Sequence, residues 1–299
     1  MYDQILFPTD GSEPAASVLD YALQIAAEHE ATIHVLNVVD TSQDSLSGMQ
    51  DDVDDVLEQE GTEIVNEAAQ RATERGITVV SEVLHGDPYE VIVEYSTQSA
   101  IGLIVMPTHG RRGLQRFLLG SVTERVINTA DVPVIAVNPR TQSLTYPCQE
   151  LLVPTDGSRG SELAVSEGVA LANATGATLH LLHVVETGSL GPDVRSLVND
   201  EELTTRADEI IADAIETAEA ATVDRIESEI EVGVPSKEIR NYIDTHEIDF
   251  TILGTHGTTD FSRYMMGGVS AKIVRTSPVP VMWVRELDSS GERDASAGG

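Results

Sequence analysis

The chain has 299 residues, of which 41% are hydrophobic and 4% aromatic, so it can bury a core made mostly of aliphatic side chains. Its 50 aspartates and glutamates against 18 lysines and arginines give a net charge of −32, which argues against nucleic acids and anionic membranes as partners. The sequence has neither a membrane-length apolar run nor a signal-peptide pattern, which predicts a cytoplasmic protein.

Short apolar runs alternate with helical patterns along the first half of the chain. Residues 4–8 are typical of a buried parallel strand, and Ser12 is placed to cap a helix directly after it. Because helices separate the strands, the pattern predicts a parallel sheet with ligands bound beyond the carboxyl ends of its strands. Further strands are predicted over 32–39, 78–84, 103–106 and 134–137, and further helices over 51–75, 88–98 and 122–130.

The second half of the chain repeats the first. Residues 5–39 align with residues 151–185 at a constant offset of 146, and both segments contain the pentapeptide Pro-Thr-Asp-Gly-Ser. Beyond Gly86 and Gly233 the offset becomes 147 and stays there. A nearly constant offset over this span indicates a duplication rather than a shared short motif.

The duplication sets the expected domain boundaries. Two α/β domains are predicted, over residues 1–140 and 149–286, each with a five-stranded parallel sheet that has helices on both faces. The linker between them carries the one cysteine, Cys148, which cannot form an intrachain disulfide and has no neighbouring histidine. The tail over residues 287–299 is rich in Ser, Gly and Asp and is predicted to be disordered.

The segment after the fourth strand has the features of an anion-binding loop. Gly110 and Gly120 lie ten residues apart, and Gly120–Ser121 begins a helix whose N-terminus offers unpaired N–H groups and the positive end of a dipole. The alternative is that the glycines only form a tight turn and that Ser121 only caps the helix. Arginines crowd this segment although the chain has few basic residues: Arg111, Arg112, Arg116 and Arg125.

Polar residues at matching positions of the two halves add to the candidate sites. Asp10 and Asp156 could accept a hydrogen bond from a ribose hydroxyl or an adenine amino group, or hold a metal through water; a turn-forming role is the alternative. His109 and His256 either order their loops or contact the ligand. No second ligand at zinc spacing accompanies them, so no metal site is assigned.

The order of these motifs resembles the universal stress protein family. In both halves a strand leads into PTDGS and a helix, a later strand leads into THG and a glycine-rich segment, and a Val-Pro-Val strand follows. The resemblance implies a Rossmann-like, adenine-nucleotide α-hydrolase-like fold with ATP, with or without Mg²⁺, as the ligand. It also implies an intramolecular pseudo-dimer, because residues 132–137 and 279–284 are apolar edge strands that need a partner; a homo-oligomer stays open.

Each half departs at one position from the G-x2-G-x9-G-[ST] pattern of the family's ATP-binding branch. Pro107 replaces the first glycine of the first half and removes an N–H group. Gly268 replaces the last serine of the second half, where Ser270 is near enough in sequence to replace the hydroxyl in part. The first half is predicted to bind triphosphate more tightly, because the second loop has Thr258, Thr259 and Asp260 where the first has Arg111, Arg112 and Gly113.

The resemblance implies a set of nucleotide-binding residues in each half, in which Val38 and Val184 line the adenine pockets. The first-half set is Pro8, Thr9, Asp10, Val38, Met106, Pro107, His109, Gly110, Arg111, Arg112, Gly113, Gly120, Ser121, Val122 and Thr123. The second-half set is Pro154, Thr155, Asp156, Val184, Gly254, His256, Gly257, Gly267, Gly268, Val269 and Ser270.

Two functions fit these motifs. The first is an adenine-nucleotide-binding protein with a regulatory role in the stress response, which hydrolyses ATP slowly at most because no general base stands beside the phosphate loop. The second is a nucleotide-free protein-interaction module of the same fold, which the departures at Pro107 and Gly268 favour. An adenylating enzyme is disfavoured, since PTDGS stands where such enzymes have a glycine- and serine-rich loop.

The acidic residues are spread along the chain rather than concentrated in its tail. This distribution is typical of a halophilic protein in a very salty cytoplasm, where screening relieves self-repulsion. An acidic interaction surface is the alternative.

Overall fold

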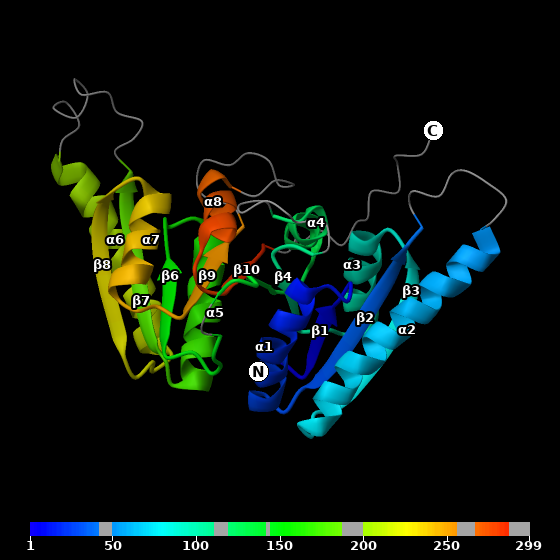
Figure 1. Cartoon of the computed structure of the whole chain (residues 1–299). Helices are drawn as coiled ribbons and strands as arrows, with labels where there is room; N and C mark the ends of the chain where they lie inside the picture. The colour runs from blue at the N-terminus through cyan, green and yellow to red at the C-terminus, as the bar shows by residue number, and fades with distance from the viewer. Residues whose placement is uncertain (42–49, 111–118, 142–143, 187–199, 256–266, 287–299) are drawn as a thin grey trace.

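The structure is a computed structural model that describes residues 1–41, 50–110, 119–141, 144–186, 200–255 and 267–286 (Figure 1). The predicted disordered tail, residues 287–299, lies outside the described residues.

The first half of the chain folds into the predicted alternation of strands and helices, with boundaries that lie within two residues of those expected. The helix after the first strand begins where Ser12 caps it, because the Ser12 hydroxyl accepts a hydrogen bond from the Ala15 N–H at 3.3 Å. The elements are β1 (Gln4–Pro8), α1 (Glu13–Glu28), β2 (Thr32–Asp40), α2 (Gln50–Glu74), β3 (Val79–Gly86), α3 (Pro88–Gln98), β4 (Leu103–Pro107), α4 (Ser121–Thr129) and β5 (Val134–Val137).

The second half repeats the same order. Its elements are β6 (Glu150–Pro154), α5 (Arg159–Thr175), β7 (Thr178–Glu186), α6 (Asp200–Ala220), β8 (Ile226–Gly233), α7 (Pro235–Thr245), β9 (Phe250–Gly254), α8 (Gly268–Thr276) and β10 (Val281–Val284).

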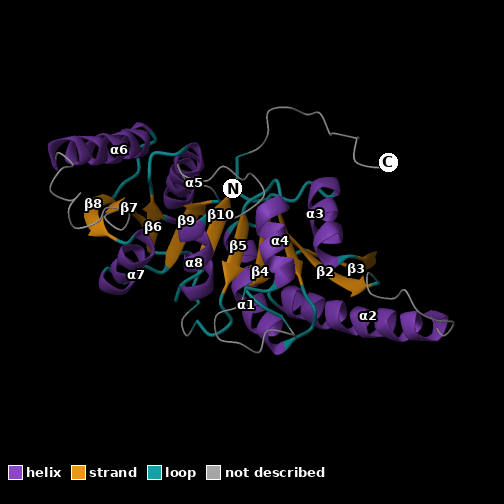
Figure 2. Cartoon of the chain, turned by 90° about the horizontal axis from the view of Figure 1, so that it is seen from above, coloured by secondary structure: helices purple, strands orange, loops and turns teal. Residues whose placement is uncertain are grey.

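The strands of the described chain form one ten-stranded sheet in the order β3-β2-β1-β4-β5-β10-β9-β6-β7-β8 (Figure 2). Strands are parallel within each half, and β5 pairs antiparallel with β10, which is the pairing predicted for the two apolar edge strands. In each half the strand order reverses between the first and fourth strands, β1 and β4 or β6 and β9. The loops that follow these neighbouring strands therefore meet, and they carry the predicted site residues.

Two hydrophobic cores lie on opposite faces of the sheet, and each extends through both halves. Side chains alternate between the cores along a strand: Ile5 and Phe7 belong to one core, and Leu6 between them belongs to the other. Helices α1, α2, α5 and α6 cover the first core, and helices α3, α4, α7 and α8 cover the second. Both faces of the sheet are thus buried, as expected for parallel strands.

Polar contacts join the two halves beside the β5–β10 pair. Arg285 donates a hydrogen bond to the Asn128 carbonyl oxygen at 2.7 Å, and Arg275 of α8 lies 3.5 Å from Glu124 of α4. The Tyr2 hydroxyl donates to the Glu167 carboxylate across the halves. The halves are therefore joined by side chains as well as by the sheet.

The linker cysteine is structural. Cys148 is 2% exposed, and burial raises the pKa of its thiol to about 12. A thiol that stays protonated at neutral pH is a poor nucleophile, so the structure supports no reactive role for Cys148. Among the described helices, none combines the length and apolar character needed to cross a membrane.

Candidate functional site

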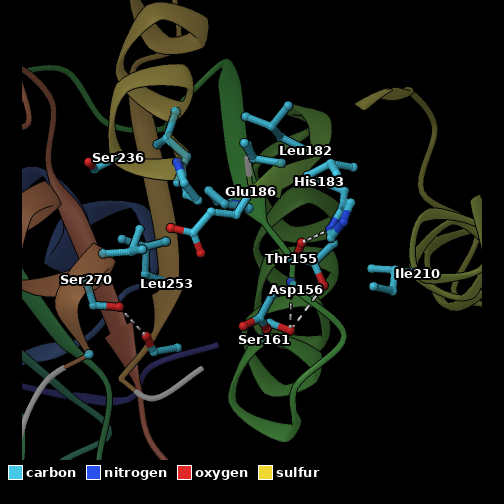
Figure 3. Close-up of a pocket in the computed structure, with 18 of the residues that line it drawn as sticks. Thr155, Asp156, Ser161, Leu182, His183, Glu186, Ile210, Ser236, Leu253 and Ser270 are labelled. Carbon is cyan, nitrogen blue, oxygen red and sulfur yellow. Dashed lines mark hydrogen bonds between the residues drawn. The ribbon is translucent and has the colours of Figure 1, made fainter. Parts of the chain in front are cut away.

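A cavity of about 620 Å³ lies in the second half, where β6, β7 and β9 end (Figure 3). This volume is in the range of pockets that hold small ligands and cofactors, about 300–1,000 Å³. Nine of the eleven predicted second-half residues line it: Pro154, Thr155, Asp156, Val184, Gly254, Gly267, Gly268, Val269 and Ser270. The other two, His256 and Gly257, lie outside the described residues.

The cavity has an apolar part and a polar part. Leu182 and Val184 of β7, Ile239 of α7 and Ile210 of α6 contribute aliphatic surface that suits a flat ring. Figure 3 shows Thr155, Asp156 and His183 on one wall, with Leu253 and Ser270 on the opposite wall.

The loop after β6 is held by its own polar groups. The Asp156 carboxylate accepts a hydrogen bond from the Ser158 N–H at 3.0 Å, so Asp156 forms the turn and also lines the cavity. The Thr155 and Ser161 hydroxyls lie 3.1 Å apart, and His183 Nδ1 lies 2.8 Å from the Thr155 carbonyl oxygen. Because a carbonyl oxygen can only accept, Nδ1 carries the proton. This wall of the cavity is therefore ordered by contacts within the protein.

The wall opposite is the N-terminus of α8. The first hydrogen bond within this helix joins the Ala271 N–H to the Gly267 carbonyl oxygen at 2.8 Å. The N–H groups of residues 268–270 therefore have no acceptor within the helix and suit an anion. A Cβ added to Gly268 would have no heavy atom within 4 Å, so this end of the helix is open.

Two groups expected to bind ligand have hydrogen-bond partners within the protein. The Ser270 hydroxyl donates to the Gly254 carbonyl oxygen at 3.1 Å, so its proton is already engaged. In the first half the Gly120 N–H donates to the Thr108 carbonyl oxygen at 2.7 Å. In each half, the loop after the fourth strand is closed by one of these hydrogen bonds, so the Ser270 hydroxyl and the Gly120 N–H already have acceptors within the protein. The spacing of the motif residues did not reveal this.

In the first half, some of the predicted residues are also in contact. A Cβ on Gly110 would overlap the Asp10 carboxylate, so the loops after β1 and β4 are in contact. The Thr123 hydroxyl donates to the Pro107 carbonyl oxygen at 2.9 Å, matching the Ser270 bond of the second half. Arg111, Arg112 and Gly113 lie outside the described residues.

His109 contacts the side chain of the residue directly before it in the loop. Its Nδ1 is 3.2 Å from the Thr108 hydroxyl, and burial, followed by the charge of Arg140, lowers the pKa of the imidazole. The contact fits a loop-ordering role.

The two halves differ beside the helix that begins at the candidate phosphate site. In the first half the Arg125 guanidinium lies 4.7 Å from the centroid of the Tyr89 ring and 3.5 Å from the Asp87 carboxylate. The residues at these three positions in the second half are Lys272, Ser236 and Val234, and all three line the cavity.

Sequence reasoning missed four ionisable residues among those that line the cavity: His183, Glu186, Arg206 and Lys272. Lys272 had a usable signal, because it is four residues after Gly268 and therefore on the same face of a helix. Arg206 belongs to α6, which no motif connected with the site.

Comparison with known proteins agrees with the duplicated architecture. The profile of the Universal stress protein family matches twice, over residues 1–138 and 148–285. Universal stress protein MJ0531 of Methanocaldococcus jannaschii is 38% identical over 140 residues, which are 46% of this chain and 82% of that protein.

Two further relatives match nearly the whole chain. A universal stress protein of Mycolicibacterium smegmatis is 25% identical over 292 residues, covering 94% of this chain and 96% of its own length. The crystal structure of a universal stress protein from Archaeoglobus fulgidus superposes with a TM-score of 0.72 at 26% identity, covering 94% of this chain and 98% of that one.

Proposed function

The chain belongs to the universal stress protein family, and from that premise we propose that it binds an adenine nucleotide and has a regulatory role in the stress response. The observation that carries the proposal is the cavity of about 620 Å³, which joins an aliphatic recess to the N-terminus of α8. A nucleotide needs both features, because its base is flat and weakly polar whereas its phosphates are anionic.

The lining residues suggest how the ligand would lie. The base would occupy the recess lined by Leu182, Val184 and Ile239. Asp156 would accept a hydrogen bond from a ribose hydroxyl or an amino group. The phosphates would face the N–H groups of residues 268–270, where the dipole of α8 favours negative charge.

The proposed activity is binding with at most slow hydrolysis. Gly268 and Val269, the cavity residues at the start of α8 where the phosphates would lie, offer no general base; the ionisable lining residues Asp156, His183 and Glu186 come from β7 and the loop after β6. ATP, with or without Mg²⁺, is the proposed ligand, and the first half is proposed as a second site of the same kind.

Native mass spectrometry of gently purified protein tests the proposal. A bound mass equal to that of ATP, ADP or AMP, which disappears on unfolding, is the expected result. Protein that carries no nucleotide and shows no calorimetric binding of ATP would contradict it.

The alternative is a protein-interaction module that has lost its nucleotide. One observation favours it for the first half: Arg125 is already paired with Tyr89 and Asp87 beside the start of α4. The same calorimetric titration separates the alternatives, because an interaction module should bind no nucleotide in either half.

A further inference from the structure

The chain has two lysines, Lys237 and Lys272, and both are in the second half. Lys272 lies on α8 one helical turn after Gly268, so the two residues share a helix face. Both line the cavity. Within the described part of the chain, no side chain forms a hydrogen bond or an ion pair with the Lys272 ammonium group.

The duplication supplies an internal comparison for this position. Arg125 occupies it in the first half, and its guanidinium is held by the Tyr89 ring and by the Asp87 carboxylate. In the second half Ser236 replaces the ring and Val234 replaces the carboxylate. The two groups that hold the cation in the first half are therefore absent where Lys272 lines the cavity.

Negative charges in and around the cavity would repel a phosphate group unless a cation offsets them. Asp156 and Glu186 line the cavity, and the whole chain carries a net charge of −32, so its field opposes an entering polyphosphate. The other lining cation, Arg206, comes from α6, on the face of the sheet opposite to α8. Lys272 is thus the described cation nearest along the chain to the N-terminus of α8.

We propose that Lys272 binds the phosphate group of a nucleotide in the second half and so selects phosphorylated nucleotides over nucleosides. A lysine ammonium is a mobile point charge that suits phosphate oxygens. The proposal rests on the proposed function of the same cavity, and it adds a residue that lies outside the glycine-rich loop.

Matched lysine variants test the contribution to affinity. Calorimetry of the full chain with ATP and with adenosine, at one salt concentration, compares the wild type with Lys272→Gln and Lys237→Gln. Lys237 is the control because it lies in the first turn of α7 and does not line the cavity. We expect Lys272→Gln to weaken ATP binding in one class of sites about tenfold, as a charged hydrogen bond would, and to leave adenosine binding unchanged. Lys237→Gln should change neither.

A chemical probe gives a second readout that is specific to this half. In an acyl phosphate derivative of ATP, a nearby lysine amine attacks the acyl carbon. An amide bond forms, the bond from carbon to the phosphate oxygen breaks, ATP leaves and the amine proton passes to the buffer. Peptide mass spectrometry should find acylation at Lys272 that excess ATP suppresses, with little acylation at Lys237.

The two experiments separate the possible failures. If the wild type binds ATP but Lys272→Gln binds it equally well and Lys272 is not protected from acylation, the role of Lys272 is refuted and the proposed function stands. If the wild type binds neither ATP nor adenosine, the proposed function fails, and the role of Lys272 fails with it.

Discussion

Replacing Gly254 with alanine is expected to destabilise the second half by about 1–3 kcal/mol, the usual cost of overpacking a well-packed site. Gly254 ends β9, where the backbone of Gly160 in α5 lies very close. A Cβ at residue 254 would stand 2.5 Å from the Gly160 carbonyl carbon and 2.6 Å from its oxygen. Non-bonded carbons pack at about 3.5–4.0 Å, so β9 and α5 must separate by about an ångström. No rotamer change relieves the overlap, because both atoms belong to the backbone.

The melting temperature is the direct measurement. One kcal/mol shifts it by about 2–4 °C in domains of 150–250 residues, so a decrease of about 2–12 °C is expected for Gly254→Ala. Gly268→Ala is the matched control, since it adds the same methyl group to the same cavity with no heavy atom within 4 Å. The control should melt at or slightly above the wild-type temperature, because alanine favours a helix more than glycine does. Equal melting temperatures for the two variants would refute the packing argument.

Three further predictions follow from charge, loop geometry and burial. Gly120→Val should reduce Mg-ATP affinity in calorimetry more than Gly267→Val does; the reverse result would assign the tighter site to the second half. Since an added Cβ at Gly120 would lie 3.3 Å from the Thr108 carbonyl oxygen, the variant's melting temperature must be measured alongside. The melting temperature of the wild type should rise between about 0.1 M and 1 M salt, over which the Debye length falls from about 10 Å to about 3 Å, and an unchanged value would count against the role assigned to a net charge of −32. Burial raises the pKa of the Cys148 thiol to about 12, whereas the thiol of the unfolded chain has a pKa of about 8.5. The contribution of the buried, protonated thiol to the free energy of unfolding is therefore complete below about pH 8.5 and is lost as the pH rises from about 8.5 towards 12. A thiol reagent at pH 8 should therefore modify Cys148 only as fast as the protein unfolds, and rapid labelling of the native protein would contradict this.

Most of the fold could be predicted because its evidence is local or repeated. In the first half, helix and strand patterns place the predicted element boundaries within two residues of those observed. The constant offset shows that the second half must repeat the first. The need of two apolar edge strands for partners predicts that β5 pairs with β10, and the structure adds that this pairing is antiparallel.

The shape of the site could not be predicted, because it depends on small differences between equivalent residues. From the sequence, Pro107 and Gly254 were interpreted only as the first position of the phosphate-binding pattern in each half. The structure shows that Gly254 also faces Gly160 at a close helix contact. In the first half the two equivalent positions, residues 107 and 14, are both proline. A residue that the sequence motif marks as a ligand contact can be a packing contact in the folded protein.

The hydrogen bonds of the loops were hidden for a related reason. A free N–H at Gly120 and a free hydroxyl at Ser270 fit the motif, but each closes its own loop onto a carbonyl oxygen at the end of a strand. Buried polar groups are almost always paired. Loop closure therefore uses these donors before any ligand arrives.

The contacts of Arg125 with Tyr89 and Asp87 do not by themselves prevent a nucleotide from binding to the first half. The Arg125 side chain is 59% exposed, and an exposed contact between a cation and an aromatic ring or a carboxylate stabilises a protein only weakly. A phosphate that offers a doubly charged partner can compete with Tyr89 and Asp87 for the same guanidinium. Pro107 is the firmer obstacle, because a missing N–H cannot be restored by a side-chain rotation. The comparison of Gly120→Val with Gly267→Val therefore weighs the missing N–H at Pro107 against the arginines for which the first half is predicted to bind more tightly.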